Sequence, residues 1–138
     1  MKKFAHIGVC VRSVDAMIDM LKNTLGVSDV SYVEMPERGQ RSAYVTVGDE
    51  GVRLELMEPM GENGGTVASF LEKHGEGLHH LSFKAAPVSS TSSTLKETGA
   101  AFEAQGCRLI GRANGLAFVH PKTAFGTLYE LTDENYGT

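Results

Sequence analysis

Apolar and polar residues alternate at the start of the chain and then change to helical spacing. Residues 4–11 alternate and contain Val and Ile, which predicts a strand. Ser13 can then cap a helix that ends at Gly26, with Ile18, Leu21 and Leu25 at helical spacing. Glycine and proline separate three further strands, predicted over residues 29–34, 42–47 and 52–57. The first part of the chain is therefore predicted to be a βαβββ unit.

The second part of the chain repeats this order. The predicted elements are a strand over residues 79–85, a helix over about 90–105, and strands over 107–110, 116–120 and 127–132. Between the two parts lies a Gly-rich linker with a short helix at about 66–74. We expect one domain over residues 1–138, made of a module at about 1–58, a linker at about 59–77 and a module at about 78–138.

Sequence similarity between the two modules supports a duplication. At an offset of 74, residues 6–24 match residues 80–98 at His, Val, Leu, Lys and Thr, with His6 falling on His80. Leu54-Glu55-Leu56 reappears as Tyr129-Glu130-Leu131 at an offset of 75. Each module thus begins with a histidine and ends with a glutamate.

Strand periodicity places each of these four residues on the less apolar face of its strand. Successive side chains of a strand point to opposite faces, so His6 and His80 lie opposite the apolar side chains of their strands, as Glu55 and Glu130 do. A carboxylate on a largely covered face needs a cation or a proton. Two neutral imidazoles and two carboxylates carry a charge of −2, which one divalent cation cancels. We therefore predict a metal site of His6, Glu55, His80 and Glu130, with nitrogen and oxygen ligands that suit zinc, nickel, cobalt, manganese or iron.

Composition excludes several other classes of function. Charged residues make up 22% and apolar residues 41% of the 138 residues, which is typical of a globular protein. The net charge of −4 and the absence of a basic run argue against nucleic-acid binding. No apolar run is long enough for a membrane span and no signal-peptide pattern is visible, so we expect no membrane partner and a cytoplasmic location. Cys10 and Cys107 are expected to be core thiols.

Longer motifs resemble a known family. The motifs are Ala5-His6-Ile7-Gly8, Leu54 to Pro59, Phe70 to Lys73 leading into Gly75 to His80, and Phe118 to Lys122 leading into Leu128 to Leu131. With the duplicated βαβββ unit, they resemble the vicinal oxygen chelate superfamily, also called the glyoxalase fold, and within it the methylmalonyl-CoA epimerases. The resemblance implies an α+β fold in which two tandem βαβββ modules form a curved, cleft-containing mixed sheet with helices on the outside.

The resemblance also implies a reaction. His6, His80 and Glu130 would be metal ligands and Glu55 would occupy the fourth ligand position, for one divalent ion such as cobalt, manganese, nickel or zinc. The expected reaction is epimerisation of a 2-substituted malonyl-CoA thioester such as methylmalonyl-CoA, by α-proton abstraction and a metal-chelated enolate. Glu130 is the favoured base, with Glu55 facing it across the site. Lys122 would bind a CoA phosphate or a carboxylate, and the protein would be a homodimer.

The chain departs from this family at two informative positions. Ser42 stands where part of the family has a glutamate proposed as a second base, and Phe125 replaces an expected glycine. Three alternatives therefore stay open on the same fold. They are a glyoxalase I-type lactoylglutathione lyase, an iron-dependent extradiol-type dioxygenase and a non-catalytic, drug-binding protein. Metal analysis separates the last of these from the enzymes.

Overall fold

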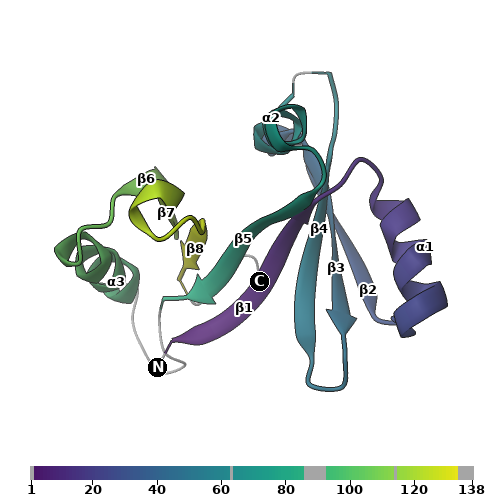
Figure 1. Ribbon diagram of the computed structural model, residues 1–138, viewed down its shortest axis with the longest axis horizontal. Coiled ribbons are helices and arrows are strands. Elements are labelled where there is room, and N and C mark those ends of the chain that lie inside the picture. Colours follow the sequence, from purple (N-terminus) through teal and green to yellow (C-terminus); the bar gives the residue numbers. More distant parts are fainter. Residues whose placement is uncertain (1, 63, 86–92, 114, 134–138) are drawn as a thin grey trace. The chain divides into compact units, whose positions relative to one another are not determined.

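A computed structural model describes residues 2–62, 64–85, 93–113 and 115–133 (Figure 1). These residues divide into two compact units, one of His6–His79 and one of Met1–Ala5 with His80–Thr138. Each unit combines strands with helices, so the predicted α+β class is confirmed. The single-domain organisation stays a prediction.

The unit of His6–His79 contains the first βαβββ module and the linker helix. Its elements are the part of β1 (Lys3–Cys10) from His6 onward, α1 (Val14–Leu25), β2 (Val30–Met35), β3 (Gln40–Val47), β4 (Val52–Pro59) and α2 (Thr66–His74), with a 3₁₀ turn at Pro36–Arg38. The strand order is β2-β3-β4-β1, in which β1 and β4 are parallel and the other pairs are antiparallel. The predicted βαβββ order and the helix at 66–74 are therefore confirmed.

The two helices of this unit cover opposite faces of its strands. Residues of α1 pack with alternate residues of β1, β3 and β4, and Figure 1 shows α1 running beside these strands. Residues of α2 instead pack on Cys10 and Met57, which point to the other face. The face that carries His6 and Glu55 is thus covered by α2 at one end. Cys10 is fully buried, as predicted for a core thiol.

The ends of α1 follow the predicted capping signals. Ser13 Oγ accepts a hydrogen bond from Ala16 N at 3.1 Å. Gly26 adopts a left-handed conformation, with φ of 72°, just after the last residue of the helix. Both boundaries of this helix are therefore set by local residues.

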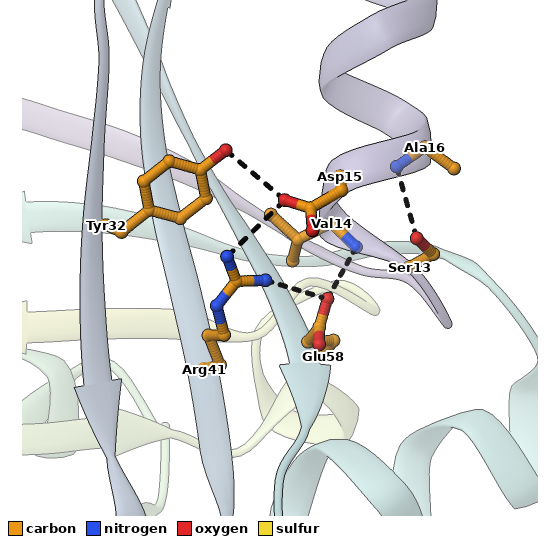
Figure 2. A network of polar contacts seen from close by, with 7 residues as sticks. All are labelled: Ser13, Val14, Asp15, Ala16, Tyr32, Arg41 and Glu58. Atoms are coloured by element: carbon orange, nitrogen blue, oxygen red, sulfur yellow. Dashed lines mark hydrogen bonds and ion pairs between the residues drawn. The ribbon is translucent and has the colours of Figure 1, made fainter.

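A polar network from the sheet also holds the start of α1 (Figure 2). Glu58 Oε1 on β4 accepts a hydrogen bond from the amide of Val14, the first helical residue, at 2.7 Å. Arg41 on β3 lies 3.5 Å from that same oxygen and 3.4 Å from Asp15 Oδ1, and it stacks on the Tyr32 ring. Because a helix leaves its first amides without partners, Glu58 supplies a cap from 44 residues away.

The other unit contains the second module. Its elements are β5 (Gly77–Lys84), α3 (Ser93–Ala104), β6 (Leu109–Ala113), β7 (Leu116–Val119) and β8 (Tyr129–Thr132), with a 3₁₀ turn at Pro121–Thr123. The strand order is β5-β8-β7-β6, in which β5 and β8 are parallel and the other pairs are antiparallel. This arrangement repeats that of the first module, so the predicted duplication extends to strand pairing.

In this unit one predicted strand begins later than expected, and the start of the predicted helix lies outside the described residues. The strand predicted over 107–110 is found at Leu109–Ala113, because Cys107 N still bonds to Phe102 O at the end of α3. Cys107 is half-buried against the core cluster of the unit and is a free thiol. Residues 90–92 of the predicted helix lie outside the described residues. No helix within the described ranges is long and apolar enough to cross a membrane.

Candidate functional site

The first candidate pair joins the two ends of the first module. His6 lies on β1 and Glu55 lies on β4, which runs parallel to β1 with Gly8 opposite Glu55. His6 Nε2 is 3.2 Å from Glu55 Oε1, and the two residues are only 9% and 5% exposed. Parallel pairing of the first and last strands therefore brings together residues 49 positions apart in the sequence.

An aromatic and a basic residue adjoin this pair on the same face. Tyr44 on β3 is opposite Glu55 in the strand register, and its ring meets the His6 ring edge-on at 5.6 Å and 77°. The guanidinium carbon of Arg53 lies 4.7 Å from the centre of the Tyr44 ring. The sequence patterns do not predict that the side chains of His6, Tyr44 and Arg53 follow one another in contact. Strand alternation places Arg53 on the face of Glu55, but the sequence does not show which β3 residue lies opposite.

The thiol beyond the pair is kept neutral. Cys10 follows His6 on the same face of β1 and is fully buried. Burial, and then the Glu55 carboxylate, raise the pKa of Cys10 to about 12. Because a nucleophilic cysteine needs a thiolate, Cys10 is unsuited to act as a nucleophile.

The second candidate pair has the same construction in the second module. His80 lies on β5 and Glu130 lies on β8, which runs parallel to β5 with Ser82 opposite Glu130. His80 Nε2 is 3.7 Å from Glu130 Oε2, and the residues are 5% and 7% exposed. In both modules the residue opposite the glutamate, Gly8 or Ser82, comes two positions after the histidine.

The modules differ at the residue opposite the glutamate. Ser82 is fully buried and donates a hydrogen bond from Oγ to Glu130 Oε1 at 2.8 Å. The equivalent residue of the first module is Gly8, which has no side chain. Ser82 therefore orients Glu130 with one oxygen and leaves the other toward His80. The alternation of His80 and Ser82 along β5 was the signal in the sequence that could have identified this residue.

The chemistry of these pairs suits a divalent cation. His6, Glu55 and His80 each offer one buried donor atom, a ring nitrogen or a carboxylate oxygen. Such donors bind transition-metal ions and zinc, and a buried carboxylate requires a cation or a proton nearby. Each pair alone could also be an ion pair with a protonated histidine.

Lys122 and Ser42 each form a polar contact with a residue two positions earlier in the chain. Lys122 is exposed in the Pro121–Thr123 turn, where its backbone N–H donates to His120 Nδ1 at 3.1 Å. Ser42 is fully buried on β3 and accepts a hydrogen bond from Gln40 Nε2 at 3.0 Å. The position at which the resemblance led us to expect a second glutamate is thus occupied by a serine that is hydrogen-bonded to a glutamine.

Phe125, at a position where the resemblance led us to expect glycine, adopts a backbone conformation that favours glycine. Its φ is 59°, in the left-handed region that favours glycine, and its side chain is fully exposed. The turn around it is closed by bonds from Ala124 N and Gly126 N to Pro121 O. The turn therefore forms with phenylalanine at a strained position.

Comparison with known proteins assigns the chain to a family. Residues 5–118 match the model of the Glyoxalase/Bleomycin resistance protein/Dioxygenase superfamily. The ethylmalonyl-CoA/methylmalonyl-CoA epimerase of Cereibacter sphaeroides is 33% identical over 129 residues, which cover 91% of this chain and 93% of that protein.

Solved structures agree with this assignment. A methylmalonyl-CoA epimerase in complex with methylmalonyl-CoA and NH₄⁺ is 28% identical with a TM-score of 0.76, over 99% of this chain and 96% of that one. A variant of the Streptomyces coelicolor methylmalonyl-CoA epimerase, in complex with 2-nitronate-propionyl-CoA, is 27% identical with a TM-score of 0.75, over 98% of this chain and 99% of that one.

Proposed function

The chain belongs to the Glyoxalase/Bleomycin resistance protein/Dioxygenase superfamily and is a methylmalonyl-CoA epimerase-like isomerase within it, and on this premise we propose that it epimerises a 2-substituted malonyl-CoA thioester such as methylmalonyl-CoA. The observation that carries the proposal is the repeated His–Glu pair, 3.2 Å apart in one module and 3.7 Å apart in the other. Two imidazoles and two carboxylates supply enough nitrogen and oxygen donors for one divalent ion.

His6, Glu55, His80 and Glu130 would hold one divalent ion. Their nitrogen and oxygen donors fit cobalt, manganese, nickel or zinc, and a charge of +2 balances two carboxylates that are each less than a tenth exposed. When bound, the ion would act as a Lewis acid toward two oxygens of the substrate.

The two glutamates would also handle the proton. Inversion at the α-carbon requires a proton to leave from one side, which makes the carbon planar, and a proton to be added from the opposite side. We assign removal of the α-proton to Glu130, which would then release it to water. Glu55, at the opposite side of the substrate, would return to the carbon a proton that it takes up from water. Ser82 would keep the Glu130 carboxylate in place through its 2.8 Å hydrogen bond. Because the neutral Ser42 hydroxyl is a poor proton acceptor, we assign this task to the paired glutamates.

The same proposal includes a role for Lys122. Lys122 is exposed and would bind a phosphate of CoA or a carboxylate. The homodimer and the cytoplasmic location stay predictions.

The first experiment is metal analysis of the purified protein. We expect about one divalent ion per chain, loss of the ion in His80→Ala, and retention of the ion in the matched control His74→Ala, whose side chain is exposed on α2. Metal-free wild-type protein, or equal metal content in the two variants, would contradict the metal site.

The second experiment measures proton exchange. Metal-loaded protein in D₂O should introduce deuterium at the α-carbon of methylmalonyl-CoA, and Glu130→Gln should lower the rate by about 10²–10⁴-fold if the residue is the base. Absence of exchange with the metal-loaded wild-type protein would refute the epimerase proposal. The same preparation should be assayed with the glutathione hemithioacetal of methylglyoxal, because turnover of that compound would favour a lyase.

A further inference from the structure

Arg53 lies at the exposed end of the face that carries Glu55. The two residues are two positions apart on β4, so they share a face and their Cα atoms are roughly 7 Å apart. Arg53 is exposed, whereas Glu55 is buried. A positive charge therefore stands at the rim beside a buried candidate ligand.

The Arg53 guanidinium lies over an aromatic ring. The guanidinium carbon is 4.7 Å from the centre of the Tyr44 ring, and the Tyr44 ring is 5.6 Å from the His6 ring. Together these contacts place the guanidinium no farther than about 10 Å from the His6 ring. A guanidinium stacked on a ring keeps its N–H groups in the plane parallel to that ring, where they can meet two oxygens of an anion.

Arg53 differs from other arginines of this unit in its partners. Arg12 pairs with Glu76 at 3.5 Å, and Arg41 pairs with Asp15 and Glu58. Within the described part of the chain, Arg53 makes its stacking contact and has no carboxylate partner. Its hydrogen-bonding edge is thus available to an external anion.

We propose that Arg53, which lies over Tyr44, is an anion-binding subsite for the acyl-CoA substrate, where the guanidinium binds a carboxylate or phosphate group of the substrate. This inference rests on the proposed function, since the substrate class comes from it. A 2-substituted malonyl-CoA offers two sources of the same chemistry, the carboxylate of its acyl group and the phosphates of its CoA. Both present oxygens in a geometry that a guanidinium fork matches.

The test is steady-state kinetics of Arg53→Gln and Arg53→Lys, with Arg12→Gln as the control. Arg12 is 65% exposed and carries the same charge, so its removal changes the net charge equally. With methylmalonyl-CoA we expect Arg53→Gln to raise KM about tenfold while kcat stays within about twofold, because the binding that is removed is equal in the ground state and the transition state. Arg53→Lys should recover part of the loss, and Arg12→Gln should leave KM unchanged.

A truncated substrate identifies the source of the oxyanion. Methylmalonyl-pantetheine keeps the carboxylate and lacks the phosphates of CoA. If Arg53→Gln also raises KM for this compound, the subsite binds the carboxylate. If the effect disappears, the subsite binds a phosphate. Either result supports the proposal.

Two results would overturn it in distinguishable ways. Absence of exchange by the metal-loaded wild-type protein would overturn the proposed function and the subsite with it. Exchange by the wild-type protein, together with an unchanged KM in Arg53→Gln at equal metal content, would overturn the subsite alone.

Discussion

Replacing Glu58 by alanine should destabilise the protein although this residue is outside the candidate site. Glu58 Oε1 accepts the amide hydrogen of Val14 at 2.7 Å and faces Arg41 at 3.5 Å (Figure 2). The variant Glu58→Ala removes both contacts and also a negative charge at the N-terminus of α1. Glu58 lies on the same strand as the candidate ligand Glu55, but three positions along a strand place the two side chains on opposite faces, so no candidate ligand is changed.

The magnitude follows from the burial of the atoms involved. Val14 is fully buried, so its amide would lose its partner without gaining full hydration, which costs about 1–3 kcal/mol. The ion pair with Arg41 joins side chains that are 21% and 25% exposed and adds up to about 1 kcal/mol. The helix dipole adds about 0.3–1 kcal/mol. We expect a total loss of about 2–4 kcal/mol, and about 1 kcal/mol for Glu58→Gln, whose amide oxygen still accepts the bond.

The assay is urea unfolding of metal-free protein followed by circular dichroism. The free energies of unfolding of wild type, Glu58→Ala and Glu58→Gln are compared with that of Glu72→Ala, a variant at an exposed glutamate of α2. The control should differ from wild type by less than about 0.5 kcal/mol. If Glu58→Ala unfolds with a free energy within about 0.5 kcal/mol of wild type, the tertiary cap does not stabilise α1 and the reasoning is wrong.

Four further predictions concern other buried or strained positions. Thr132→Val should raise the free energy of unfolding by about 1 kcal/mol in the same urea assay, because the buried Thr132 hydroxyl has no partner among the described residues; a destabilised variant would contradict this. Gly65→Ala should lower the melting temperature, since a Cβ there would lie 2.3 Å from the carbonyl oxygen of Arg38, and an unchanged temperature would show that the backbone adjusts freely. Phe125→Gly should stabilise by about 1 kcal/mol through relief of the left-handed conformation, unlike Phe125→Ala, and equal effects of the two changes would refute the strain. Burial raises the pKa of Cys10 from 9.0 to about 12, so above pH 9 the unfolded state loses a proton that the folded state retains. The free energy of unfolding should therefore fall between about pH 9 and 12, and it should fall less steeply in Cys10→Ala. Parallel pH profiles of the two proteins would disprove this.

Much of this protein was predictable from the spacing of its residues. Alternation and helical spacing predicted the order of the strands and helices, and Ser13 and Gly26 marked both ends of α1. The repeat identified His6, Glu55, His80 and Glu130 as equivalent pairs before any geometry was known. These features could be predicted because side-chain direction and capping depend on residues within a few positions of each other.

Contacts across strands required the tertiary structure. The sequence does not state that β1 pairs with β4 in parallel, and this pairing is what brings His6 within 3.2 Å of Glu55. The same holds for the hydrogen bond from Ser82 to Glu130 and for the stacking of Arg53 on Tyr44. The strand β6 begins at Leu109 and not at the predicted Cys107, because the Cys107 amide donates a hydrogen bond to Phe102 O at the end of α3.

The physical reason is the range over which each choice is made. The sequence by itself determined which residues share a face and which positions are duplicated, since steric alternation operates within one element. Strand partners and register depend on how all the apolar faces are buried together, which no local pattern contains. The tertiary structure alone therefore decided which side chain stands beside each candidate ligand, including Ser82 beside Glu130 and the Tyr44–Arg53 pair beside His6.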